Sequence, residues 1–127
     1  MKKFKVEKLI RDNIFDNIRK NKFTKIEYKK LDNKEFLEKL KKKFYEELEE
    51  FDLSDEKNIK NELADLQLIM DYFLKTLNIS KKELTVISKD KNKKVGVFDK
   101  RIYLKNIELD ENDDWFSYYQ KRYEEIK

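Results

Sequence analysis

Four carboxylates with helical spacing are the residues of this chain best placed to do chemistry. Glu47 and Glu50 form one pair, Glu62 and Asp65 form the other, and the members of each pair are three positions apart. Side chains at this spacing lie on the same face of a helix. One pair on each of two neighbouring helices could bring four oxygen donors to a shared pocket, which suits hard divalent cations such as Mg²⁺, or Mn²⁺ in its place. The pattern therefore predicts a metal site at these four residues.

The positions of these acids matter more than their number. With 27 acidic residues among 127, about five or six pairs at this spacing are expected by chance. Glu62, however, falls within the apolar stripe of its expected helix, and Glu47 lies at the edge of the stripe of the preceding helix. An acid that faces a core must shift its pKa, pair with a cation or ligate a metal. An ion pair with one of the 31 lysines and arginines is the alternative to a metal.

Two long helices joined by a short turn are expected to carry the acids. Asp32 and Glu35 have the spacing of a capping box and predict a helix that runs to about Phe51. Residues 52–55 form the expected turn, in which Ser54 or Asp55 would cap a second helix that continues to about residue 77. In an antiparallel hairpin of this kind, the two acidic pairs would lie at similar heights. The expected apolar stripes comprise Leu37, Leu40, Phe44, Leu48 and Phe51, and then Ile59, Leu63, Leu66, Ile69, Met70, Phe73 and Leu77.

Shorter elements are expected on either side of this hairpin. The chain before it predicts a helix over residues 7–20, and then an extended connector or small strand over residues 25–31. After the hairpin, Ser80 and the acid three residues later repeat the capping-box spacing and begin a further long helix. Gly96 is placed to stop that helix. Residues 97–104 alternate apolar and charged side chains and are expected to run extended.

The composition predicts one all-α domain. The chain has 127 residues, 15.7 kDa, one glycine and no proline, which suits long helices better than a sheet with tight turns. We expect residues 1–109 to form the domain and residues 110–127 to form an amphipathic aromatic helix packed on it. A partner surface is the alternative for that aromatic stripe. The second helix of the hairpin is apolar on two sides, which favours a central place in a bundle or at a dimer contact.

Several function classes are excluded by what the composition lacks. The chain contains no Cys and no His, so thiolate metal sites, Cys nucleophiles and a His general base are ruled out. No apolar run approaches the roughly 20 residues that span a bilayer, and the N-terminus lacks the apolar region of a signal peptide. These features predict a cytoplasmic protein without a membrane partner. Any catalysis must rest on carboxylates, Lys, Arg, Tyr, hydroxyls or metal-bound water.

Four segments give the chain a family resemblance. They are KLIRDNI at residues 8–14, EELEEF at 46–51, ELADLQLI at 62–69 and VGVFDKRIYL at 95–104. In order and spacing they resemble the all-α nucleoside triphosphate pyrophosphatases of the MazG and phosphoribosyl-ATP pyrophosphohydrolase superfamily, and within it the small, single-domain house-cleaning branch. The resemblance implies a MazG-like helical bundle centred on an antiparallel helix hairpin, with short extended connectors. It further implies a homodimer, with a tetramer as the alternative.

The resemblance also implies a reaction and roles for particular residues. The acidic hallmark of the family, E-x-x-E followed by E-x-x-D, falls on the four carboxylates, which would hold Mg²⁺. The expected reaction is hydrolysis of a nucleoside triphosphate, possibly a non-canonical one, to a monophosphate and pyrophosphate. Glu50 and Glu47 are the expected catalytic residues, with Glu50 orienting the attacking water. The residues expected to bind the substrate phosphates are Lys8, Arg11, Lys91, Lys94 and Arg101.

Three departures from the family pattern and two alternative functions accompany this expectation. Phe15 stands where relatives have Pro, and Val95 and Val97 replace an Arg and a Gly of the late motif. The first alternative is a catalytically inactive member of the fold that binds nucleotides or a protein. The second is a basic helical nucleic-acid binder, suggested by a net charge of +4 and a pI near 9.0. Acids and bases are interleaved along the chain, so nucleic acid is not the expected partner.

Overall fold

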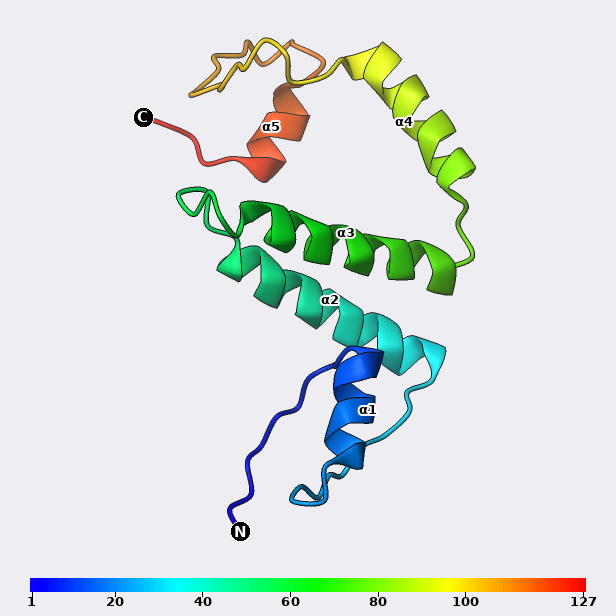
Figure 1. The fold of residues 1–127 in the computed structure, drawn as a ribbon. Coiled ribbons are helices and arrows are strands. Elements are labelled where there is room, and N and C mark those ends of the chain that lie inside the picture. The colour runs from blue at the N-terminus through cyan, green and yellow to red at the C-terminus, as the bar shows by residue number, and fades with distance from the viewer. The chain divides into compact units, whose positions relative to one another are not determined.

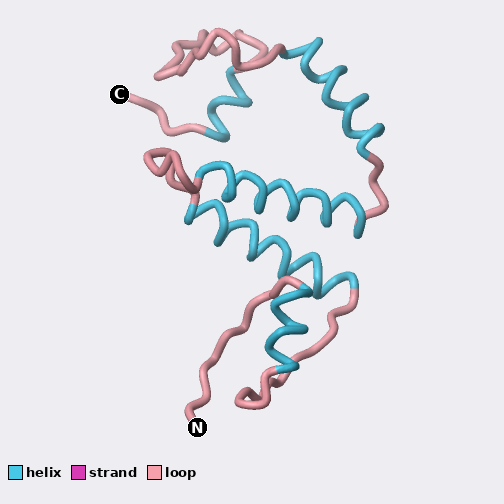
Figure 2. The backbone as a smooth tube through the Cα atoms, viewed as in Figure 1, coloured by secondary structure: helices cyan, strands magenta, loops and turns pink.

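The chain folds into five α-helices joined by irregular segments (Figure 1). A computed structural model describes all 127 residues and contains no strand (Figure 2), which confirms the all-α class and leaves residues 25–31 as a connector. By contact, the chain divides into two compact units, residues 1–89 and 90–127. None of the helices combines the length and apolar character needed to cross a membrane. The helices are α1 (Asp12–Lys20), α2 (Asn33–Glu50), α3 (Ile59–Thr76), α4 (Lys81–Val95) and α5 (Phe116–Arg122).

Helices α2 and α3 pack side by side as the predicted antiparallel hairpin (Figure 1). The Asp32 carboxylate accepts a hydrogen bond from the Glu35 backbone N–H at 2.8 Å, so the expected cap begins α2. Leu40 and Ile69, one from each arm, are the two buried apolar residues, at 5% and 7% exposure. Towards the end of the hairpin that is remote from its loop, the rings of Phe36 and Tyr72 meet edge to face at 6.2 Å. The two arms therefore meet at these positions, whereas Leu48, Leu63, Met70 and Leu77 of the predicted stripes are 46%, 50%, 44% and 50% exposed.

The loop of the hairpin is longer than predicted, because α3 begins at Ile59 and not near Ser54 or Asp55. The side chain of Asp52 accepts hydrogen bonds from the Ser54 hydroxyl at 2.6 Å and from its backbone N–H at 2.9 Å. The carboxylate of Asp55 is bound in turn by the Asn58 amide at 3.0 Å. Asp55 also accepts a hydrogen bond from the Asn58 backbone N–H at 3.3 Å, as a cap would, and its carbonyl accepts one from the Ile59 N–H at 3.0 Å. These contacts stabilise turns that lead into α3, and the regular helix begins only at Ile59.

The first helix is shorter than predicted, because it begins at Asp12 and not at residue 7. Glu7 has a φ of +50°, and Arg11 is extended with φ −68° and ψ 148°. The segment before α1 consequently runs as irregular chain and leads Lys8 and Leu9 to α2, where both line a small hollow. After α1, the rings of Phe15 and Tyr28 pack edge to face at 4.7 Å.

Helix α4 starts and stops at the predicted residues. The Ser80 hydroxyl accepts a hydrogen bond from the Glu83 N–H at 3.1 Å, and the Glu83 carboxylate accepts one from the Ser80 N–H at 3.2 Å. Beyond the helix, Gly96 has a φ of +84° and its N–H bonds to the Asn92 carbonyl at 2.9 Å. The boundary between the two compact units falls within α4, after residue 89.

The aromatic tail forms a shorter helix than its stripe predicted. Helix α5 spans only seven residues, and Trp115 and Tyr123 at its two ends are each 60% exposed. The rings along it contact their neighbours in sequence, as in the edge-to-face pair of Trp115 and Tyr118 at 5.4 Å. Packing of this helix on residues 1–109 stays a prediction.

Candidate metal centre

The hairpin places its two acidic pairs at similar heights near the loop. Glu50 is the last residue of α2, and Glu62 lies in the first turn of α3. The carboxylate of Glu62 accepts a hydrogen bond at 3.0 Å from the backbone N–H of Asp52, just beyond α2. The start of α3 therefore lies level with the end of α2. Since the helices are antiparallel, one turn further from the loop brings Asp65 to the level of Glu47.

Each of the four acids has a distinct environment. Glu47 is the most enclosed, with a side chain that is 13% exposed and an ion pair to Lys43 at 3.4 Å. The side chain of Asp65 is 39% exposed and pairs with the guanidinium of Arg11, which comes from the segment before α1. Glu62 is half-buried, and its hydrogen-bond partner is a backbone N–H instead of a cation. Glu50 is exposed and forms no ion pair.

The four acids fit Mg²⁺ in their chemistry, and the two pairs lie at the same height on the two arms of the hairpin. All four groups are carboxylates, the oxygen ligands that this ion prefers. No three acidic side chains converge to metal-ligand spacing in the structure. Two of the acids instead hold Lys43 and Arg11. Partly exposed ion pairs contribute about 0–1 kcal/mol each, so a cation that displaced both would sacrifice little stability.

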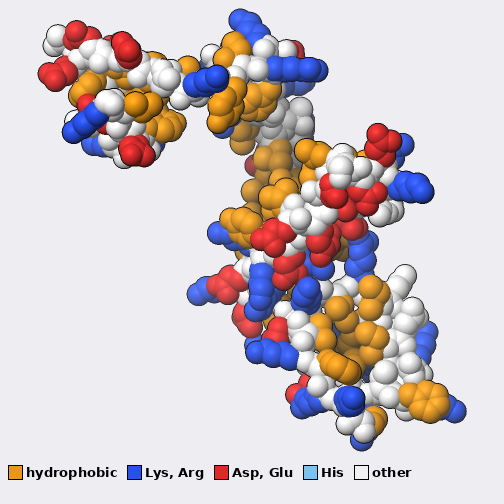
Figure 3. All heavy atoms as spheres, turned by 90° about the vertical axis from the view of Figure 1, so that its left-hand side faces the viewer, with side chains coloured by type: hydrophobic (Ala, Val, Ile, Leu, Met, Phe, Trp, Pro, Cys, Tyr) orange, Lys and Arg blue, Asp and Glu red, His pale blue; other side chains and the backbone are white.

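The end of α2 keeps an excess of negative charge, although Lys8 and Lys43 pair with two of its acids. Its last five residues contain four acids, and its last turn contains no base. The C-terminus of a helix carries a partial negative charge, so these acids are at its unfavourable end. In Figure 3, acidic side chains gather near the loop end of the hairpin. A divalent cation bound at this end would offset both the repulsion among the acids and the helix dipole.

The residues expected to bind phosphate fall into two groups. Lys8 pairs with Glu46 at 3.7 Å, and Arg11 pairs with Asp65, so both lie beside the acidic hairpin. The structure thereby brings the early motif together with the two acidic motifs. The later candidates are exposed and belong to the second compact unit; they are Lys91 and Lys94 in α4 and Arg101 in the segment after it.

Two contributors to this region were not identified from the sequence. Lys43 precedes Glu47 by four residues, a spacing that is known to favour ion pairs and could have revealed it. The Asp52 N–H that binds Glu62 could not be predicted from the sequence, because almost every residue type carries a backbone N–H. The loop also perturbs Asp52 itself, since the Ser54 hydroxyl and then the Ser54 N–H lower the pKa of its carboxyl below 3.8.

The candidate site consists of the four carboxylates of the hairpin and the two early bases beside them. Similarity to known proteins does not add to this description. Comparison of the chain with protein-family models, with curated proteins and with solved structures found no match.

Proposed function

We propose that this protein is a Mg²⁺-dependent nucleotide pyrophosphohydrolase, which cleaves a nucleoside triphosphate to a monophosphate and pyrophosphate. The observation that carries the proposal is the placement of two acidic pairs on facing arms of one hairpin, at the same level near its loop. The order of the four motifs, with their resemblance to the MazG superfamily, supports it as well. The absence of Cys and His from the chain is compatible with this chemistry, which needs neither.

Bound Mg²⁺ would neutralise phosphate charge and make a bound water more acidic. The chain's own acids would divide the remaining work according to their surroundings. Glu47, Glu62 and Asp65 are partly enclosed and suited to hold the ion. Glu50 is exposed and carries no ion pair, so it is free to accept a hydrogen bond from the attacking water. The water oxygen would bond to the α-phosphorus and pass a proton to Glu50, while the bond from the α-phosphorus to the α–β bridging oxygen would break. Pyrophosphate would leave with that oxygen.

The two early bases would orient the triphosphate against these acids. Arg11 carries five N–H donors in a planar fork, so it can bind Asp65 and a phosphate oxygen together. Lys8 is a mobile point charge, and its ion pair with Glu46 is long, at 3.7 Å. A phosphate group could replace Glu46 as its partner without disturbing the helices.

A second copy of the chain would cover the exposed apolar residues of the hairpin and so form a homodimer. Buried apolar residues number only two, Leu40 and Ile69. Leu48 on α2, and Leu63 and Met70 on α3, are 46%, 50% and 44% exposed. Apolar positions on both arms thus remain open to a partner, and a shared helix interface is the common solution. Light scattering during gel filtration should give twice the chain mass of 15.7 kDa; a monomer would contradict the dimer.

The activity is tested by incubating the protein with Mg²⁺ and a panel of canonical and damaged nucleoside triphosphates. Release of pyrophosphate that depends on Mg²⁺ and stops on chelation supports the proposal. Nucleotide binding without cleavage would favour the inactive alternative. Steeply salt-dependent binding to oligonucleotides, unaffected by Glu62→Gln, would favour the nucleic-acid binder.

A further inference from the structure

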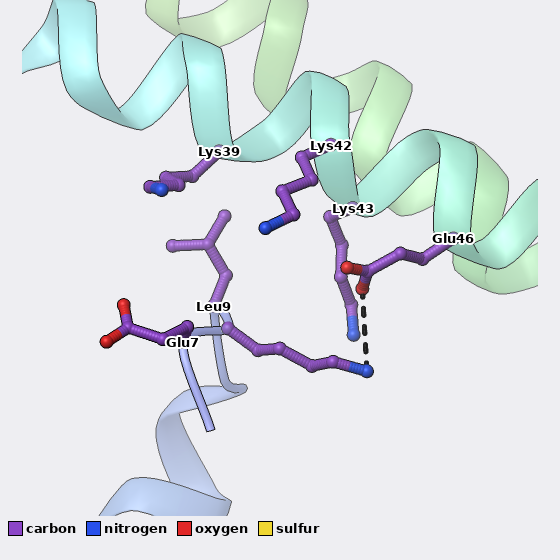
Figure 4. Close-up of a pocket in the computed structure, with 7 residues that line it drawn as sticks. Glu7, Leu9, Lys39, Lys42, Lys43 and Glu46 are labelled. Atoms are coloured by element: carbon purple, nitrogen blue, oxygen red, sulfur yellow. Dashed lines mark ion pairs between the residues drawn. The ribbon is translucent and has the colours of Figure 1, made fainter. Parts of the chain in front are cut away.

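A cluster of lysines surrounds a hollow between the N-terminal segment and the middle of α2 (Figure 4). Leu9 is half-buried, and its side chain points towards α2, between Lys39 and Lys42. The hollow has a volume of about 10 Å³, which is about the space of one water molecule. The residues that line it are Glu7, Lys8, Leu9, Lys39, Lys42, Lys43 and Glu46.

The charges around the hollow do not balance. Four lysines line it against two acids. Lys8 is paired with Glu46 at 3.7 Å, and Lys43 is paired with Glu47 outside the hollow at 3.4 Å. The remaining two, Lys39 and Lys42, form no ion pair within 4.0 Å. Like charges three and four positions apart on one helix repel each other, so this turn of α2 is held against an electrostatic cost that a bound anion would remove.

The cluster is assembled by a contact distant in sequence. Lys8 joins three lysines that lie more than 30 residues later in the chain. The residue before it, Glu7, has a φ of +50°, which is uncommon for a residue with a side chain. The Leu9 side chain points into the space between Lys39 and Lys42, and Lys43 lies on the side of Glu46 (Figure 4).

We infer that Lys8, Lys39, Lys42 and Lys43 form a binding site for phosphate groups. Lysine recognises phosphate as a mobile point charge and needs no fixed geometry. Several lysines on one surface can therefore bind a phosphate group that lies over the hollow, which is too small to enclose one. The phosphate could be free, as pyrophosphate, or part of a nucleotide, because the recognising chemistry is the same. The site shares Lys8 with the proposed triphosphate site, but its other lysines lie away from the acidic pairs, and it takes an anion instead of a cation. Its existence does not depend on hydrolysis.

The test measures pyrophosphate binding by calorimetry in the presence of a chelator, so that no divalent cation contributes. The double variant Lys39→Gln, Lys42→Gln removes the two unpaired charges and keeps much of their aliphatic length. We expect it to bind about tenfold more weakly or worse, and to keep its helix content. The matched control is Lys34→Gln with Lys41→Gln, which makes the same charge change at exposed positions of α2 away from the hollow. The control should bind like the unaltered protein.

Absence of binding without divalent cations would overturn the inference, and so would an equal loss in the control variant. A nucleoside triphosphate measured in parallel distinguishes the sources: tighter binding than pyrophosphate indicates a nucleotide, and equal binding indicates free phosphate. Glu62→Gln separates this inference from the proposed enzyme, because it should keep pyrophosphate binding in chelator. If the protein shows no turnover but the double lysine variant binds pyrophosphate more weakly than the unaltered protein, the phosphate site is supported and the hydrolase is not.

Discussion

Glu62→Gln is the substitution that best separates a catalytic carboxylate from a structural one. In the structure, Glu62 accepts the Asp52 N–H at 3.0 Å and is half-buried. Glutamine keeps an oxygen that can accept the same bond, and it differs mainly in losing the charge. A hydrogen bond to a charged group contributes about 1 kcal/mol more to stability than a bond between neutral groups. Solvent screening at a half-buried residue reduces this difference. The free energy of unfolding should therefore fall by no more than about 1 kcal/mol.

The expected effect on Mg²⁺ is much larger. A unit negative charge and a divalent cation about 4 Å apart attract by roughly 2 kcal/mol even at the dielectric constant of water, which corresponds to about 30-fold in affinity. A lower effective dielectric at a half-buried residue increases this figure. We expect Mg²⁺ titrations of pyrophosphate release to show at least this loss of affinity, and turnover at moderate Mg²⁺ to fall below detection.

Glu49→Gln is the matched control, because it removes one charge from an exposed acid at the same end of the hairpin. It should leave both turnover and the Mg²⁺ requirement within about twofold, as screening weakens the influence of solvent-exposed charges. The reasoning is refuted if Glu62→Gln retains full turnover at unchanged Mg²⁺ affinity. It is equally refuted if the two variants lose activity to the same extent.

Three further predictions concern the elements that hold this region. Ser80→Ala removes the oxygen that caps α4 and should lower the free energy of unfolding by about 1 kcal/mol in urea titrations. Ile69→Ala, in the buried centre of the hairpin, should cost about 2 kcal/mol or more, while Leu53→Ala, at a position that is 75% exposed, should cost about 0.5 kcal/mol or less. Ser54→Ala removes the main cause of the lowered pKa of Asp52, so the pKa measured by NMR should rise towards 3.8. An unchanged pKa of Asp52 in Ser54→Ala would contradict this cause of the shift. Because the pKa of Asp52 is lowered in the folded chain, the carboxylate contributes stability above its unfolded-state pKa, and this contribution is lost as the pH falls through the folded-state pKa.

The parts of the fold that the sequence predicted depend on contacts between near neighbours. The two capping boxes, at Asp32 and Ser80, each need only residues within three positions. The stop at Gly96 depends on one backbone conformation. The hairpin itself follows from two apolar stripes and the short connection between them, since stripes of this kind have few other ways to be covered.

The parts that it did not predict depend on contacts between distant segments or on competition among turns. The residues before α1 have helical periodicity, but Lys8 and Leu9 instead lie beside α2 and leave that segment irregular. The start of α3 was displaced because Asp52 and Asp55 bind their own neighbours and so stabilise turns. Likewise, the ion pair of Arg11 with Asp65 spans 54 positions, and no local pattern specifies it.

The order of charges along α2 connects the two proposed sites. Four lysines in its middle, Lys39, Lys41, Lys42 and Lys43, precede the four glutamates at its C-terminal end. Acids at that end are the reverse of what the helix dipole favours, so the stability of the helix does not explain this part of the order. Lys43 and Glu47 join the two regions through their ion pair. A cation bound by Glu47 would release Lys43 to the hollow and increase the positive charge there. Because coupling between two binding sites is reciprocal, phosphate held by Lys43 would in turn free Glu47 for the metal, and each ligand would strengthen the binding of the other.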